Sequence, residues 1–499
     1  MKKSKLVTNA AYLTLTGFLL RGLGMLLRVY ISKKIGEEGM GLYQLIQTVY
    51  FLFITVAQSG ISVAFTRCLS SRVAVDDAVG AQNTTSSALR LSTLLGTLSC
   101  VAMSALSNPI CRLWLGDTRC TGALSLLSLS LPFVAVCGVL SAYFIVYENA
   151  VFGCISQIIE QITRIATIAL LTSFSSPSNV KQSLMIIVFA NVVSEALSCL
   201  FLIVCYMIRH KNTPYKSYSK EIVSTALPVA ASRYLASVLR TCENVLVPNA
   251  ITVFTKDRST ALSQFGALKG MAIPLLFFPY SFLSAITTLL VPRVTGAQAR
   301  GNKDSLRTTT QRVCFITLFS SIVAAGIFFT LADFLGMAIY KSARVSQMLL
   351  WLSPIVPFMY LDSVCDGLLK GLGKQKEVLL HSSIDSALRI VLILIFVPRL
   401  GIVGFLGVMV VSNIFISFMN FYTLCKTSDV KFAFSIRLFA PVSATLLSSL
   451  LTNFLSDCGA FSTNPVVILL VFCAIFAFFY ALFGLLKKFK KIRVKSALF

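Results

Sequence analysis

The chain contains 499 residues, of which 56% are hydrophobic and only 13% are charged, and its formal net charge is +25. Soluble domains carry about 25% charged residues, so this composition excludes an ordinary soluble protein and indicates an integral membrane protein. The net charge alone would suit a nucleic-acid-binding protein, but most of the 44 Lys and Arg residues fall in segments expected on the cytoplasmic side. That distribution follows the positive-inside rule and favours membrane lipids, not nucleic acid, as partners.

Apolar stretches recur along the whole chain, each near the length of about 20 residues that a helix needs to cross a bilayer. Stretches of this length form helices in lipid because a helix satisfies its own backbone hydrogen bonds. The first stretch lacks a small-residue cleavage site, so we expect a retained helix. The sequence thus predicts an all-α multi-pass membrane protein with about fourteen transmembrane helices and both termini in the cytoplasm. The expected ranges are 6–32, 40–66, 88–110, 122–146, 150–174, 183–208, 221–247, 262–291, 310–334, 345–369, 378–398, 401–425, 434–456 and 464–486.

The second half of the chain resembles the first. Arg164 corresponds to Arg389, and Pro132 to Pro357, at a constant offset of 225 residues. Six predicted helices therefore recur as the next six, and because six is even both halves insert with the same orientation. This parallel repeat about the membrane normal predicts a substrate site between the halves and alternating access by rocking lobes.

The repeat also defines the expected domains. Residues 1–210 and 211–427 form two pseudo-symmetric six-helix lobes, and residues 428–499 add two further helices and a basic cytoplasmic tail. The 14 cysteines lie singly, with no C-x-x-C motif and no histidine cluster, so we expect neither a firm metal site nor a cofactor.

Basic side chains inside the predicted helices are the strongest indication of a binding site, because each costs roughly 2.5–3.5 kcal/mol at mid-helix. Arg21 and Arg28 are seven residues apart, as are Arg233 and Arg240, so each pair lies on one helix face about 10 Å apart. The repeat superimposes the two pairs at an offset of 212. Four guanidinium groups facing one cavity would bind a multiply charged anion, and arginine binds phosphate bidentately. Lys269 would add a fifth charge.

Two alternatives to that anion site remain open. Arginines near helix ends, Arg28 above all, can extend their charged groups to the membrane surface. They can also pair with acids on other helices. Polar residues of the second helix, Gln44, Gln47 and Gln58, could hydrogen-bond sugar hydroxyls or neighbouring helices.

Acidic residues inside the helices suggest two further roles. Glu160 precedes Arg164 by four residues and Asp385 precedes Arg389 by four, a spacing that favours ion pairs along one helix. We expect these to be structural pairs, with coupling to protons or sodium as the alternative. Glu243 and Asp362 form a second set of acids with two interpretations. They could bind Na⁺ or H⁺ and couple it to transport, or they could balance the charge of nearby cations.

The segment "LLRGLGMLLRVYISKKIGEEGMGLYQL", followed by "QSGISVAFTRCLSS", resembles the opening of a known family. This is the stage V sporulation protein B and polysaccharide biosynthesis transporter family of the multidrug/oligosaccharidyl-lipid/polysaccharide (MOP) exporter superfamily, which includes lipid II flippases. The resemblance is strongest over residues 9–75. It implies a MATE-like fold in a bacterial cytoplasmic membrane, with a central cavity. It also implies that Arg21 matches an essential cavity arginine of lipid II flippases, whereas Arg28 is displaced by one residue from the second.

The function implied is that of a flippase for an undecaprenyl-pyrophosphate-linked glycan such as lipid II, which serves peptidoglycan, surface polysaccharide or spore cortex assembly. Glycan polymerases are then candidate partners. The alternative is a cation-coupled antiporter for drugs or small metabolites on the same fold. Drug exporters of the superfamily often carry an acid on the first helix, and this first helix has none. An enzyme is not expected, because the outer loops are too short for a catalytic site.

Overall fold

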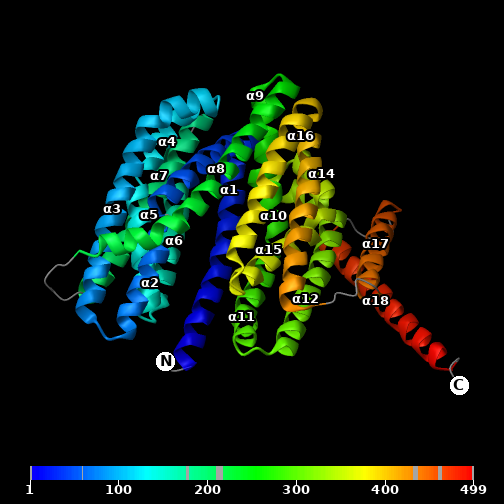
Figure 1. Ribbon diagram of the computed structural model, residues 1–499. Coiled ribbons are helices and arrows are strands. Elements are labelled where there is room, and N and C mark those ends of the chain that lie inside the picture. The colour runs from blue at the N-terminus through cyan, green and yellow to red at the C-terminus, as the bar shows by residue number, and fades with distance from the viewer. Residues whose placement is uncertain are drawn as a thin grey trace. The chain divides into compact units, whose positions relative to one another are not determined.

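The computed structural model describes residues 3–58, 60–175, 179–209, 217–430, 436–458 and 464–496, and these residues form helices joined by short turns (Figure 1). The predicted all-α class is therefore confirmed. Nine helices in the described part of the chain are long and apolar enough to cross a membrane, or up to eleven if each bent pair is one span.

This number is smaller than the fourteen expected for two physical reasons. The helices α1 (Lys3–Gln58) and α16 (Gln375–Ser428) each merge two expected spans across a kink, at Gly36 and at Gly401. Gly36 has φ 67°, in the left-handed region that glycine adopts without strain. In addition, the expected span 262–291 is divided among four helical elements that together cover residues 258–299.

Contacts group the described helices into two compact units. The first unit comprises Met1–Gly270 and Ser386–Gly404, and the second comprises Met271–Asp385 and Phe405–Phe499. The division of the repeat at residues 210 and 427 stays a prediction.

The first unit contains the helices that carry most of the predicted site residues. Besides α1 and part of α16, its elements are α2 (Ile61–Ala74), α3 (Ala78–Pro109), η1 (Ile110–Trp114), η2 (Thr118–Cys120), α4 (Thr121–Ser128), α5 (Leu131–Val146), α6 (Ala150–Ser175), α7 (Val180–Arg209), α8 (Ser219–Thr255), α9 (Arg258–Phe265) and most of η3 (Gly266–Ala272). The helix α8 bends by 49° at Pro228, where a missing backbone donor breaks the helical hydrogen bonding. Before the bend, Ile222 and Ala226 of α8 pack on α2, and after the bend α8 runs along α1.

The second unit is built around α12 and α15, which pack on each other and on α11. Its elements besides part of α16 are α10 (Ile273–Phe277), α11 (Tyr280–Ala299), α12 (Lys303–Thr330), α13 (Ala332–Leu335), η4 (Gly336–Tyr340), α14 (Ala343–Leu352), η5 (Ser353–Ile355), α15 (Val356–Gly371), α17 (Ile436–Asp457) and α18 (Pro465–Ser496). Aliphatic side chains fill the space between these helices, and Leu368 and Leu424 are completely buried there. The two last helices, α17 and α18, pack against each other.

In the first unit, α1 crosses the start of η3 at unusually close range. A methyl group added to Gly266 would lie 2.0 Å from the Glu37 carbonyl oxygen and 2.4 Å from the Gly41 backbone nitrogen. Both obstacles are backbone atoms, so only the absence of a side chain at Gly266 allows the two helices to approach this closely. The contact fixes η3, and Lys269 with it, against α1.

We expect Gly266→Ala to destabilise the protein by about 1–3 kcal/mol or more, because the added methyl group overpacks a backbone crossing. The thermal unfolding midpoint of the purified protein in detergent measures the effect. Gly17→Ala is the matched control, because open space surrounds Gly17 on α1. Equal midpoints for the two variants would contradict the close crossing.

Candidate anion-binding site

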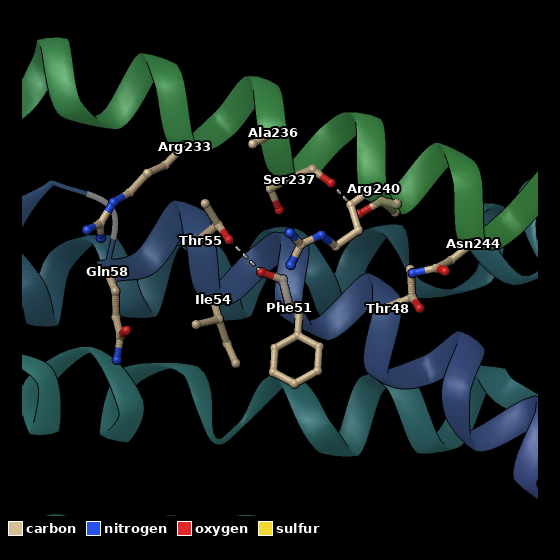
Figure 2. A pocket seen from close by; sticks show the side chains of 11 residues that line it. Thr48, Phe51, Ile54, Thr55, Gln58, Arg233, Ala236, Ser237, Arg240 and Asn244 are labelled. Atoms are coloured by element: carbon tan, nitrogen blue, oxygen red, sulfur yellow. Dashed lines mark hydrogen bonds between the residues drawn. The ribbon is translucent and has the colours of Figure 1, made fainter. Parts of the chain in front are cut away.

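Two arginines of α8 lie in one cavity of about 440 Å³ between this helix and the second half of α1. Arg233 and Arg240 are two helical turns apart on the same face of α8. Figure 2 shows both guanidinium groups extending from α8 toward α1. Both side chains are exposed, so a ligand in the cavity can reach them.

Six of the nine other lining residues carry a hydroxyl or an amide group, and the rest are apolar, including one aromatic ring. From α1 come Thr48, Phe51, Ile54, Thr55 and Gln58, and from α8 come Ala236, Ser237, Thr241 and Asn244. The Thr55 hydroxyl donates to the Phe51 carbonyl at 2.8 Å and the Thr241 hydroxyl donates to the Ser237 carbonyl at 2.8 Å, so both hydroxyl oxygens can still accept a hydrogen bond. Cations, hydroxyls and an amide together suit an anionic ligand that also carries hydroxyl groups.

Sequence reasoning found the α8 side of this cavity and missed most of the α1 side. Of the lining residues on α1, it named only Gln58, whose side-chain nitrogen donates to the Val134 carbonyl at 2.6 Å. A signal was present, because Thr48, Thr55 and Gln58 recur at spacings of seven and three, which places them on one helix face.

Arg21 and Arg28 both lie on the first half of α1 with exposed side chains. Among the described residues that line the cavity, neither of them is found. The structure therefore brings together two of the four predicted arginines, and a shared site for all four stays a prediction.

Lys269 and Arg389 meet at a buried acid of α8. The Lys269 ammonium lies 3.6 Å from the Glu243 Oε1 atom, and the Arg389 guanidinium lies 3.4 Å from the same oxygen. The Glu243 side chain is only 6% exposed. Glu243 lies one helical turn beyond Arg240, so this cluster directly adjoins the cavity.

The acids expected to take part in cation coupling have protein partners in the structure. The Asp362 carboxylate, in the second unit, accepts a hydrogen bond of 2.7 Å from the Asn420 side chain, which also contacts His381 at 2.8 Å. Across the described residues, no group of three or more His, Cys, Asp and Glu side chains could hold a metal ion. A cation site that uses Glu243 and Asp362 stays a prediction.

The expected helix pairs differ between the two halves of the chain. Arg164 Nη2 lies 2.5 Å from Glu160 Oε1 on α6, and it also lies 3.5 Å from Glu195 on α7, which sequence reasoning did not assign to it. In the second half, the Asp385 carboxylate accepts a hydrogen bond from Ser412. The direct pairing of Asp385 with Arg389 stays a prediction.

Comparison with known proteins identifies the family. The family described as "Polysaccharide biosynthesis protein" matches residues 6–298, more than half of the chain, and the MatE family matches residues 261–395. The chain belongs to the polysaccharide biosynthesis protein family.

Individual relatives and structures agree with this family. Stage V sporulation protein B of Bacillus subtilis (strain 168) is 23% identical over 98% of this chain and 97% of its own length. Lipid II flippase MurJ of the same organism is 22% identical over 78% of this chain and 77% of its own length. The solved structure of lipid II flippase MurJ in an inward closed conformation superimposes with a TM-score of 0.72, at 16% identity, over 96% of this chain and 99% of that one.

These matches confirm the predicted family and the predicted MATE-like fold. The solved structure of an inward-facing multidrug resistance MATE family transporter has the same fold, with a TM-score of 0.68 at 15% identity over 83% of this chain and 94% of that one.

Proposed function

We propose that this protein is a flippase that moves an undecaprenyl-pyrophosphate-linked glycan precursor, lipid II or a similar lipid, from the inner to the outer leaflet by alternating access. The observation that carries the proposal is the cavity of the first unit, where Arg233 and Arg240 lie beside hydroxyl and amide groups. A pyrophosphate carries several negative charges, and guanidinium groups bind phosphate oxygens bidentately. Hydroxyls and amides suit the first sugar.

The relatives support a role in cell envelope assembly. Two of them are named for sporulation and a third is named a lipid II flippase. We therefore propose that the exported precursor is used to assemble peptidoglycan. The same export could serve the spore cortex or another surface polysaccharide. The protein then lies in the bacterial cytoplasmic membrane with both termini in the cytoplasm, and glycan polymerases that consume the exported lipid are its partners.

A cation-coupled antiporter for drugs or small metabolites is the competing function. It needs an acid that is available to an ion, and its candidates are Glu243 and Asp362. Lys269 and Arg389 contact the Glu243 carboxylate, so its charge is already shared by two cations of the protein. The positive cavity beside it also repels cationic drugs, and both features support the flippase.

Complementation tests the proposal. We expect the wild-type chain, expressed in cells depleted of their own lipid II flippase, to restore growth and the amount of lipid II exposed on the outer leaflet. A chain that inserts normally but exposes no lipid II would refute lipid II as the cargo. Export of another pyrophosphate-linked glycan by the same cells would then identify the head group.

A further inference from the structure

In the cluster around Glu243, two cations from different helices share one carboxylate oxygen. Lys269 and Arg389 contact one oxygen, Oε1, at 3.6 and 3.4 Å. The shorter ion pairs among the described residues are closer, as between the Arg72 guanidinium and a Glu221 oxygen at 2.6 Å. Charge-assisted hydrogen bonds are strongest at about 2.7–2.9 Å, so Glu243 holds its two cations loosely.

Positive side chains gather around Glu243. Arg240, one turn before Glu243 on α8, adds a third cation on the cavity side. Three cations, Arg240, Lys269 and Arg389, thus lie near one carboxylate. Cations held close together in a membrane interior are costly, and an anion that enters from the cavity would relieve this cost.

The helix that carries Lys269 is irregular at this point. Lys269 lies in η3, a π-helical segment, and such segments are frequent at functional sites. The backbone of η3 is held against α1 by the crossing at Gly266, whereas the lysine side chain has four flexible carbons. The ammonium group can therefore change partner while its backbone stays in place.

We infer that Glu243 is a built-in counter-ion, which holds Lys269 and Arg389 until the pyrophosphate of the substrate enters beside Arg240 and takes over these two cations. The inference rests on the proposed function, because it requires an anionic substrate in the cavity. It makes Glu243 a positioning residue that competes with the substrate. It also adds Arg389 to the groups that contact the anion. The return of Lys269 and Arg389 to Glu243 then promotes release of the substrate on the other side.

Binding of inorganic pyrophosphate to the purified full-length protein, measured by calorimetry, tests this inference. Glu243→Gln removes the competing charge, and we expect it to bind pyrophosphate about tenfold more tightly than wild type, while export slows because release is impaired. Glu243→Asp keeps the charge and should restore an affinity near that of wild type. Glu195→Gln is the matched control, because it neutralises another acid that contacts an arginine inside the membrane. It should leave pyrophosphate affinity unchanged.

The outcomes separate the inference from the proposed function. If Glu243→Gln binds pyrophosphate no more tightly than wild type while Arg240→Gln weakens binding, the counter-ion role is wrong and the anion site stands. If Arg240→Gln and Arg233→Gln also leave binding unchanged, the anion site itself is wrong.

A second variant covers the case in which Glu243→Gln does not fold. Lys269→Gln should then weaken pyrophosphate binding by about tenfold. Lys370→Gln, which removes an exposed lysine paired with Asp366, should not. Equal affinities for these two variants would overturn the inference.

Discussion

Replacing Arg233 and Arg240 together by alanine should reduce export of the lipid-linked glycan to background while the protein remains inserted and folded. A hydrogen bond to a charged group contributes about 1.5–3 kcal/mol, so each lost guanidinium weakens anion binding about 10- to 100-fold. Because both residues line one cavity, the loss should be larger in the double variant than in either single one. Exposed lipid II in the depleted cells measures export, and immunoblotting of membranes measures insertion.

A lysine variant tests whether the shape of the guanidinium group, and not only its charge, is needed. Arg240→Lys keeps the positive charge but loses the planar fork, so we expect only partial recovery of export. Arg112→Ala is the control, because Arg112 is also exposed but does not line the cavity. Normal export by the double alanine variant would exclude this cavity as the anion site, whatever the cargo.

Much of the fold could be predicted because membrane helices depend on length and hydrophobicity, which are local properties of the sequence. The boundary predicted between 378–398 and 401–425 falls at Gly401, where α16 is kinked. The expected span 262–291 failed for a reason that hydropathy does not register. Its first residues pack at backbone distance on α1, and the chain there forms α9, η3 and α10 in place of one straight helix.

The site was predictable only where both of its residues lie on one helix. The spacing of Arg233 and Arg240 reveals a shared face directly. The partners of Lys269 and Arg389 did not follow from spacing, because Glu243 reaches them by tertiary packing across 26 and 146 residues of sequence. The same holds for Glu195, which is 31 residues from Arg164. An acid and a base on different helices become a pair only when the helix packing is known.

Arg164→Leu is expected to have the largest effect on stability. Arg164 contacts Glu160 at 2.5 Å and Glu195 at 3.5 Å, and its Nε donates to the Ser194 hydroxyl at 3.3 Å. Without the guanidinium, two carboxylates inside the membrane lose their common counter-charge, which costs about 3–5 kcal/mol. We expect a large fall in the thermal midpoint and in protein abundance. Lys370→Leu, which breaks an exposed pair with Asp366, should cost at most about 1 kcal/mol.

Exchanging Glu160 and Arg164 tests whether Arg164 is paired with Glu160 alone or with both Glu160 and Glu195. If Arg164 served Glu160 alone, exchanging the two residues would restore full abundance. Because Glu195 contacts the same guanidinium, the exchanged glutamate at position 164 would face Glu195, and like charges repel. The double variant Glu160→Arg/Arg164→Glu should therefore recover only in part. Adding Glu195→Gln should then raise abundance further, whereas full recovery of the double variant would show that Glu195 does not contribute to the cluster.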